Sequence, residues 1–502
     1  MSVALPPPSP PTEAELSMAA DGVRAIPIEY ESYRLFLLGP QLIEVDRMRR
    51  LIAQADTLSN AVRAIAQAHY DAGYLGARLR YARNGDDVFI LVEAPDLASV
   101  DISAPLQSYF EDLPTGKPLR DRDFEPRRVL AALHAERAGA PAISRLAEVD
   151  GGQQLQVDLL ESDERSYELS ARYSNYGNRF VGRNLLDLSA RKSTDDGDNA
   201  NLMLTLAPTR DEDAADEYYE GSLSWSRVTP YGLFGASAHV VDYKQPAGNQ
   251  RIDGDLEEYQ LAWSYPLAAT LSSRWILDLS VDYTDKQRSA FEDIVTLQDE
   301  QYASVQAGID FAHDGLWGDR TWDALLGVEL RHGLRDTQGE SGAALDYFLY
   351  RPRGHFKIEL ADRLFLGAAA VAQFSSDSLP EQSQWLLGGS DAVQAYLPGV
   401  AVGDRGMLGL LELEYKSLSV GSVDLTPRLF VETGTTEFVA TEAFPDGERV
   451  ELSDAGMELG ASWRKIIEAS VSYAWPIDDS DLSAAARGRY EAGVLFRVEA
   501  TF

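Results

Sequence analysis

The side chains that most often carry out enzyme chemistry are few in this sequence, and they are not grouped. Its six histidines stand at positions 69, 134, 239, 313, 332 and 355, with no metal-ligand spacing between any two, and cysteine is absent. Without cysteine, disulfide frameworks, thiolate metal sites and cysteine nucleophiles are excluded. The patterns G-x-S-x-G, H-E-x-x-H and the phosphate-binding loop are also missing. The sequence therefore predicts a protein that is not an enzyme and that holds neither a metal nor another cofactor.

The charge and hydropathy of the chain exclude further classes of protein. Acidic residues outnumber basic ones by 80 to 45 over 502 residues, and the formal net charge is −35. Such a chain repels phosphate backbones, so no nucleic-acid partner is expected. The hydrophobic content of 45%, with 23 Tyr and 39 Gly, is too high for a disordered chain. No apolar run reaches the roughly 18 residues of a membrane-spanning helix, so the one membrane architecture left is a β-barrel.

Polar and apolar side chains alternate along short segments between residues 163 and 502. At the end of the chain, Tyr490, Ala492, Val494, Phe496, Val498, Ala500 and Phe502 alternate with Arg489, Glu491, Arg497 and Glu499. A period of two predicts strands that have one wet face and one apolar face. We count sixteen such segments, joined alternately by short turns and by long acidic loops. This pattern predicts a mainly β fold, a 16-stranded antiparallel transmembrane β-barrel with both chain ends in the periplasm.

The residues before the barrel predict a linker and two small α+β modules. Residues 1–27 are rich in proline and are expected to be extended, with a poor helix signal over 12–21. They lack the basic and apolar regions of a signal peptide, which we expect to have been removed. Residues 28–96 and 97–162 each have the pattern of one strand, two helices and two strands. Neither module contains a catalytic motif, which favours docking modules.

The predicted loop over residues 375–405 differs from the other connections. It is rich in glycine and apolar residues, which do not suit an exposed loop, so we expect it to fold back into the barrel lumen. Its candidate functional residues are Gly388, Gly389, Val393, Gln394, Ala395, Tyr396, Gly403, Asp404 and, just beyond it, Gly406. On the thirteenth predicted strand, alternation places Arg428, Phe430, Glu432 and Gly434 on one face. If that face is the lumen, Arg428 is near enough to help neutralise Glu432.

These features together resemble a known family. The number of modules, the number of strands, the position of the long loop and the terminal Phe502 make residues 28–502 similar to the outer-membrane-protein-85 superfamily. Within it, the chain resembles the two-partner secretion transporters of the haemolysin and haemagglutinin type. The two modules match that family's pair of polypeptide-transport-associated (POTRA) domains. The resemblance implies a V-R-G-[YF] motif in the loop, whose Arg pairs with the Asp of F-x-D-x-G in the barrel wall.

The sequence departs from both motifs. It has Val393-Gln394-Ala395-Tyr396 in the loop and Phe430-Val431-Glu432-Thr433-Gly434 in the strand. Gln394 still offers two amide donors to the Glu432 carboxylate, although a neutral donor makes a weaker anchor than a guanidinium fork. Arg428, Arg405 or water in the lumen would then neutralise Glu432. The alternative is that the loop is a plug whose motif has decayed.

The resemblance implies an outer-membrane translocase that binds an unfolded secreted protein and passes it through the barrel. Its POTRA domains would bind this protein in the periplasm along an unpaired strand edge, for which 77–81 and 143–148 are the candidates. Outer-membrane lipid and the barrel-assembly machinery are further expected partners of a monomer, and the assembly signal would comprise Tyr490, Phe496 and Phe502. An assembly or insertion factor with the same fold and a plugged diffusion channel are the alternatives.

Overall fold

The computed structural model describes residues 26–30, 32–40, 42–160, 166–208, 217–247, 250–290, 295–339, 344–440 and 448–502. The chain divides into two compact units, one formed mainly by the residues before position 163 and the other mainly by the residues after it. The expected helix over residues 12–21 lies outside the described residues. No helix in the described ranges is both long and apolar enough to cross a membrane.

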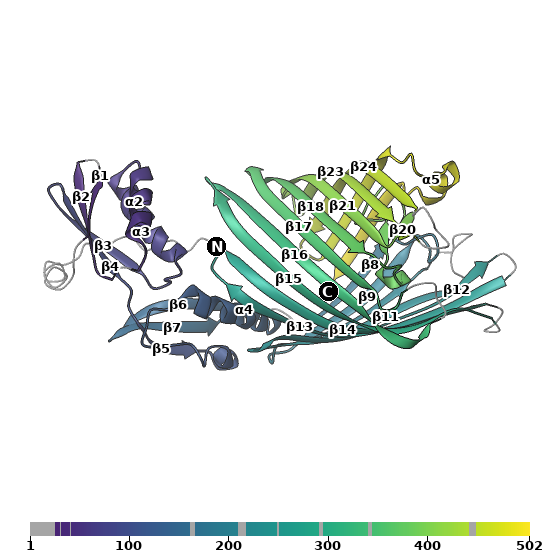
Figure 1. Cartoon of the computed structure of the whole chain (residues 1–502), viewed down its shortest axis with the longest axis horizontal. Coiled ribbons are helices and arrows are strands. Elements are labelled where there is room, and N and C mark those ends of the chain that lie inside the picture. The colour runs from purple at the N-terminus through teal and green to yellow at the C-terminus, as the bar shows by residue number, and fades with distance from the viewer. Residues whose placement is uncertain are drawn as a thin grey trace. The chain divides into compact units, whose positions relative to one another are not determined.

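The first module is a four-stranded sheet packed against two helices (Figure 1). Its strands are β1 (Ile26–Tyr30), β2 (Tyr33–Leu38), β3 (Arg78–Asn84) and β4 (Asp87–Glu93), in the order β1-β2-β4-β3. Its helices are α2 (Val45–Gln54) and α3 (Leu58–Asp71), and Thr57 caps α3 by accepting a hydrogen bond from Asn60 N at 3.2 Å. Strand β1 is an addition to the predicted pattern and pairs along β2. The edges of this sheet are therefore β1 and β3.

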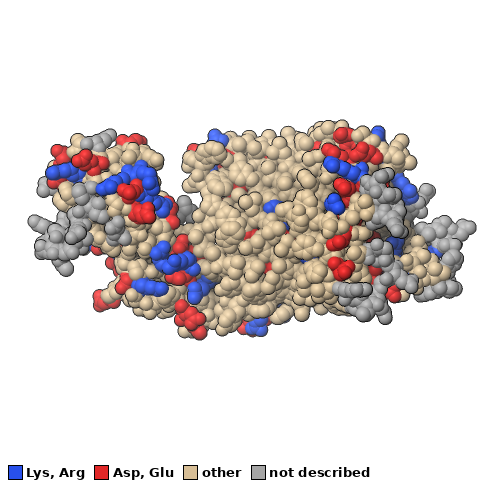
Figure 2. Space-filling view, in the orientation of Figure 1, with Lys and Arg blue, Asp and Glu red and all other residues tan. Residues whose placement is uncertain are grey.

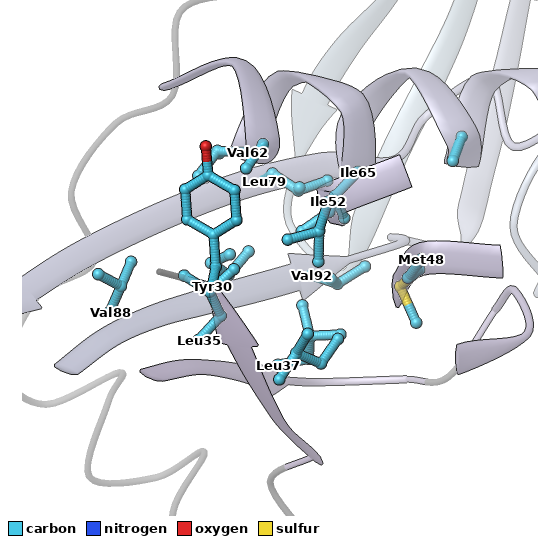
Figure 3. Packing of buried hydrophobic residues seen from close by; sticks show 14 of the residues in the cluster. Tyr30, Leu35, Leu37, Met48, Ile52, Val62, Ile65, Leu79, Val88 and Val92 are labelled. Atoms are coloured by element: carbon cyan, nitrogen blue, oxygen red, sulfur yellow. The ribbon is translucent and has the colours of Figure 1, made fainter. Parts of the chain in front are cut away.

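Figure 3 shows the core of this module, in which the apolar faces of both helices meet the sheet. The residues labelled there are Tyr30, Leu35, Leu37, Met48, Ile52, Val62, Ile65, Leu79, Val88 and Val92.

The second module has a three-stranded sheet with the order β5-β7-β6. Its elements are β5 (Leu97–Ile102), the 3-10 helix η1 (Ala104–Tyr109), α4 (Asp121–Arg137), β6 (Ala142–Val149) and β7 (Gly152–Leu159). The sequence pattern predicts helices over 106–113 and 125–138, with Pro126 in the first turn of the second. The first is instead the shorter helix η1, and α4 begins at Asp121, so Pro126 lies inside it. Strand β6 pairs with β7 on one side and forms an edge of the sheet.

In the described residues of the second unit, sixteen long antiparallel strands close into a barrel, and Figure 1 shows several of them side by side. They are β8 (Tyr167–Ser174), β9 (Leu185–Ser193), β10 (Asp198–Leu206), β11 (Glu217–Thr229), β12 (Gly232–Ala247), β13 (Gln250–Ala269), β14 (Ser273–Ala290), β15 (Val295–Trp317), β16 (Arg320–Gly339), β17 (Phe348–Ala361), β18 (Leu364–Ser375), β21 (Arg405–Tyr415), β23 (Val423–Glu437), β24 (Arg449–Trp463), β25 (Ile467–Asp478) and β26 (Val494–Thr501). The three-residue strand β22 (Leu418–Val420) lies in the turn between β21 and β23. The predicted 16-stranded fold is confirmed.

The barrel side chains alternate between lumen and outer surface, as a period of two requires. On β23, Leu429 and Val431 are exposed on the outside, whereas Phe430 and Glu432 are buried. Figure 2 shows a broad band of barrel surface that is almost free of charged side chains. This apolar band is the surface that a lipid bilayer covers.

Two of the connections predicted as long loops consist mostly of strand. Only residues 248–249 separate β12 from β13, and only residues 291–294 separate β14 from β15. Their acidic composition suggested solvated loops, but a hairpin that extends beyond the membrane also carries polar side chains, because water surrounds both of its faces.

The last strand begins later than predicted. Residues 484–490 form helix α5 (Ala484–Tyr490), whose cap Ser483 accepts a hydrogen bond from Ala486 N at 3.1 Å, and β26 starts only at Val494. The expectation that Tyr490 belongs to the outward row of the last strand is therefore wrong. Phe496 and Phe502 do lie on that strand and at its end, and Phe502 is exposed.

Candidate functional site

The long loop between β18 and β21 is folded and packs against the barrel wall. It contains the short helix η2 (Glu381–Ser383) and a hairpin of β19 (Trp385–Leu387) and β20 (Ala401–Gly403), in which Trp385 lies opposite Gly403. Both hairpin strands lie against β23. Leu387, Val393 and Tyr396 are buried in one cluster with Phe430 of that strand. The loop is therefore docked on the wall.

The base of the loop is held by the carboxylate of Asp404, which is fully buried. Its two oxygens accept hydrogen bonds from Leu379 N at 2.7 Å and Val439 N at 2.8 Å. Gly406 leaves room for the loop, because a Cβ at this position would lie 2.0 Å from Trp385 Cδ1. A Cβ at Gly403 would likewise lie 2.3 Å from Thr436 Oγ1 and 2.7 Å from Glu437 N. Asp404 and the two glycines thus close the loop where it joins the barrel.

The tip of the loop is shaped by backbone hydrogen bonds. Gly388 and Gly389 have positive φ angles of 96° and 100°, and their amides donate to Ala392 O and Tyr396 O, each at 2.7 Å. Val393 has a φ of 59°, which is unusual for a β-branched residue. This conformation turns the next two amides, those of Gln394 and Ala395, toward the barrel wall.

Two carboxylates of the barrel wall receive these amides. Gln394 N donates to Glu432 Oε2 at 3.0 Å, and Ala395 N donates to Asp454 Oδ2 at 2.6 Å. The contact between Gln394 Nε2 and Glu432 Oε1 is long, at 3.5 Å. The docking therefore depends more on peptide N–H groups than on the amide side chain of Gln394, through which we expected the contact.

Asp454 is the functional residue that the sequence reasoning missed. It lies directly opposite Glu432 in the register of β23 and β24, and the two side chains are 0% and 2% exposed. Asp454 Oδ1 has no hydrogen-bond partner among the described residues. Alternation on β24 places Asp454 on the lumen face with Gly456 and Glu458, but only the strand register shows which of them meets Glu432.

The nearby cations make their contacts elsewhere. Arg428 forms ion pairs with Glu412 at 2.7 Å and Glu458 at 2.8 Å, so it reaches Glu432 only through its longer-range charge. Arg405 donates to Ser375 O at 2.8 Å. Within the described ranges, neither arginine forms an ion pair with Glu432.

The wall beneath the loop is fitted to it by glycine. A Cβ at Gly434 would lie 2.7 Å from Leu387 Cδ2 and 3.1 Å from Val393 Cγ2. On the next strand, Gly456 makes room for the ring of Phe430, because a Cβ there would lie 2.3 Å from Phe430 Cζ. Glycine at these positions lets the loop tip lie against the wall without a gap.

The connection between β25 and β26 covers the loop tip. The Tyr396 hydroxyl donates to Asp479 Oδ2 at 2.7 Å, Leu397 N donates to Tyr490 O at 2.7 Å, and Ala492 N donates to Ala395 O at 3.0 Å. Tyr490, which we expected on the outer surface, therefore lies beside the loop. No residue spacing indicated these contacts, since they follow from helix α5.

The same connection leads directly to the seam that closes the barrel. Strands β26 and β8 pair over a short length. Arg497 lies opposite Ser174 at one end of this pairing, and Thr501 lies opposite Ser170 at the other. Asn175 holds the two strands together beside Ser174. Its Nδ2 donates to Val494 O and its Oδ1 accepts from Phe496 N, each at 2.7 Å.

The chemistry of the site is that of a docked plug. Among the described residues, no group of three or more His, Cys, Asp or Glu side chains could hold a metal ion. The arrangement instead combines buried apolar packing with hydrogen bonds that must break together if the loop is to leave the wall.

Comparisons with known proteins agree with this geometry. The family model described as haemolysin secretion/activation protein ShlB/FhaC/HecB matches residues 151–462, more than half of the chain. The solved structure of CdiB from Escherichia coli is similar with a TM-score of 0.72 and 17% identity, over 98% of this chain and 93% of that one. CdiB from Acinetobacter baumannii is similar with a TM-score of 0.62 and 13% identity, over 99% and 95%.

At these identities the structural likeness shows the fold, and no curated protein matches the sequence. The family model carries the assignment, because it spans most of the barrel and the loop. The chain belongs to the haemolysin secretion/activation family, the two-partner secretion transporters of the outer-membrane-protein-85 superfamily.

Proposed function

We propose that this protein is the outer-membrane translocase for one secreted partner, which its two POTRA domains bind in an unfolded state before it passes through the barrel. The observation that carries the proposal is the loop of residues 376–404, which is folded, packs on the lumen wall and is held there by hydrogen bonds to Glu432 and Asp454 rather than by covalent links. A plain diffusion channel is expected to keep its lumen free of such a plug. A transporter needs a closed resting state that its substrate can open.

The edge strand β6 is the site to which we assign partner binding. In the part of the chain that the structure describes, no strand pairs with the outer side of Ala142–Val149, and Ile143 is 47% exposed. An extended peptide can add to such an edge through main-chain hydrogen bonds, which demand little of the peptide sequence. The other edge, β5, is partly occupied, since Leu97 N donates to Lys117 O and Leu97 O accepts from Gly116 N.

The edge β3 of the first module is a weaker candidate. Its side chains Arg78 and Arg80 are engaged in ion pairs with Glu148 of β6 and with Glu93 of the neighbouring strand. The ion pair with Glu148 also links β3 to β6, so both edges lie on the same side of the POTRA pair.

The test is a titration of a fragment of residues 26–160 with the unfolded secretion domain of the partner encoded beside it. We expect saturable binding, with NMR shifts along β6. Ile143→Lys should weaken binding several-fold, whereas the matched control Val100→Lys, on the opposite edge of the same sheet, should not. Shifts confined to α4 would contradict edge addition. Absence of any binding would favour the insertion-factor or channel alternative.

A further inference from the structure

Three neighbouring turns of the barrel form an exposed basic surface at the end where the chain terminates. We call Arg363, Lys416, Arg464 and Lys465 the basic rim; all four are exposed. Lys416 N donates to Arg363 O at 2.8 Å, which joins the first two turns. Trp463 Nε1 donates to Ser422 Oγ at 3.2 Å and Thr501 N donates to Ile466 O at 2.8 Å, which join the third turn to the second and to the chain end.

The backbone at these turns is unfavourable for the residues that occupy it. Arg363, Arg464 and Lys465 have φ angles of 63°, 51° and 57°. Two-residue hairpin turns with positive φ favour the sequence Asn-Gly, and other L-residues are strained in this left-handed conformation. Three of the five non-glycine residues with positive φ in the described chain are therefore cations of this rim. Strain that persists at a surface turn indicates that the side chains serve a purpose other than folding.

Among the described residues, the rim has no counter-ions. In the described ranges, none of its four side chains forms an ion pair with a carboxylate, although the chain carries a net charge of −35. Arg464 lies 5.2 Å from the centre of the Trp463 ring, Lys416 lies 4.4 Å from that of Phe365, and Arg363 Nη1 donates to Ser417 O at 2.9 Å. The three turns comprise residues 362–363, 416–422 and 464–466. Asp362 is the one acidic residue among them, so the turns keep a net positive charge.

Apolar side chains connect the rim to the lipid-facing surface of the barrel. Trp463 and Ile467 end the outward rows of β24 and β25, opposite each other in the register. Beyond them Leu418, Val420 and Ile466 are 48%, 59% and 43% exposed. An aromatic residue at the membrane boundary with cations just outside it is the arrangement that lipid head groups recognise.

We propose that the basic rim binds the phosphate groups of anionic phospholipids in the leaflet that borders this end of the barrel. The lipid tails continue along the apolar surface beside Trp463, and the head groups supply the counter-ions that the described residues do not provide. Zwitterionic phospholipids carry no net charge to balance the rim, so anionic lipids are preferred. This site is separate from the docked loop, since among the described residues no hydrogen bond or ion pair joins the basic rim to residues 376–404.

The test uses the purified full-length protein and native mass spectrometry with phosphatidylglycerol or phosphatidylethanolamine. The variant Arg363→Gly, Lys416→Ser, Arg464→Asn, Lys465→Gly removes the four charges and gives the turns residues that they favour, so it will fold at least as well. The matched control removes four exposed arginines of the first module: Arg34→Ser, Arg49→Ser, Arg50→Ser, Arg63→Ser.

We expect the wild type and the control to retain phosphatidylglycerol over phosphatidylethanolamine by about tenfold or more, and the rim variant to lose this preference. The rim variant should also have the higher unfolding temperature in detergent without lipid, because its turns are relaxed. Equal retention of the two lipids by the wild type would overturn the proposal, as would an unchanged preference in the rim variant or an equal loss in the control. Secretion of the partner, measured in the same variants, tests the proposed function separately.

Discussion

Glu432 and Asp454 face each other on neighbouring strands, and they accept hydrogen bonds from the consecutive amides of Gln394 and Ala395. The family resemblance implies an arginine at position 394 to balance a carboxylate in the wall. In this chain the two acids hold the peptide backbone of the loop instead. The loop is therefore anchored by groups that no substitution at position 394 other than proline can remove.

This arrangement predicts that the wall matters more than the Gln394 side chain. Glu432→Ala leaves Gln394 N without its acceptor, which should destabilise the docked loop by about 1–3 kcal/mol and raise channel activity in a planar bilayer. Gln394→Ala removes only the contact at 3.5 Å and should resemble the wild type. Gln394→Arg adds a cation beside two carboxylates and should reduce current noise. If the wild type and all three variants give identical conductance traces, this contact no longer controls the loop, as the decayed-motif alternative requires.

A second prediction concerns the close approach of the loop to Gly434. Gly434→Ala places a methyl group 2.7 Å from Leu387 Cδ2, so the loop tip must shift away from β23. We expect a larger conductance and faster proteolysis of the loop, with the folded barrel retained. Gly409→Ala is the matched control, because its nearest neighbour, Thr433 Cγ2, would lie at an ordinary 3.6 Å. Equal conductance in both variants would contradict the prediction.

The chain end should be required for barrel assembly. Phe502 N donates to Leu169 O at 2.8 Å and Leu169 N donates to Phe502 O at 3.3 Å, so deleting Phe502 removes the last pairing of the seam as well as an exposed aromatic ring. We expect much less folded, heat-modifiable protein in the membrane. Phe502→Leu keeps the backbone pairing and separates the two effects: if its yield is normal, Phe502 serves only as an apolar anchor.

The stability of the first module should depend on pH through His69. Burial lowers the pKa of its imidazole below the ordinary 6.5, and its Nδ1 lies 2.8 Å from Ile65 O in the helix. Above pH 6.5 the side chain is neutral in both the folded and the unfolded state. As the pH falls below 6.5, the unfolded state takes up a proton first, and the free energy of unfolding decreases by up to about 1.4 kcal/mol per pH unit.

Urea denaturation of the fragment 26–160 at pH 7.5 and pH 5 measures this effect. His69→Leu should remove most of the difference between the two values. An unchanged pH dependence in this variant would assign it to another group.

The barrel could be predicted from the sequence because its strands alternate strictly, as Met457, Leu459 and Trp463 do on β24. The loop position followed from its length and its glycines. The partnership of Glu432 with Asp454 could not be predicted, because it depends on the register of two strands, and a shift by one residue moves every side chain to the other face.

Local sequence patterns could not predict two further features of the structure. Strand β1 has five residues that include Pro27, which weakens a strand signal, and it is stabilised by its pairing with β2. Tyr490 alternates with its neighbours as a strand residue would, but Ser483 caps a helix there and the loop tip packs against it. In both places contacts with distant residues decide the structure.

The short seam also determines the order in which this barrel can form. Strands β8 and β26 lie at the two ends of the barrel sequence, so Ser170 and Thr501 are the most distant partners in their register, whereas every other pair of neighbouring barrel strands is consecutive around the ring. The entropy of loop closure makes this pairing the slowest to form, after the hairpins are in place. Until then the nascent sheet has two open edges, and the hydrogen bonds of Asn175 at the top of the seam are among the last that commit it to a closed ring.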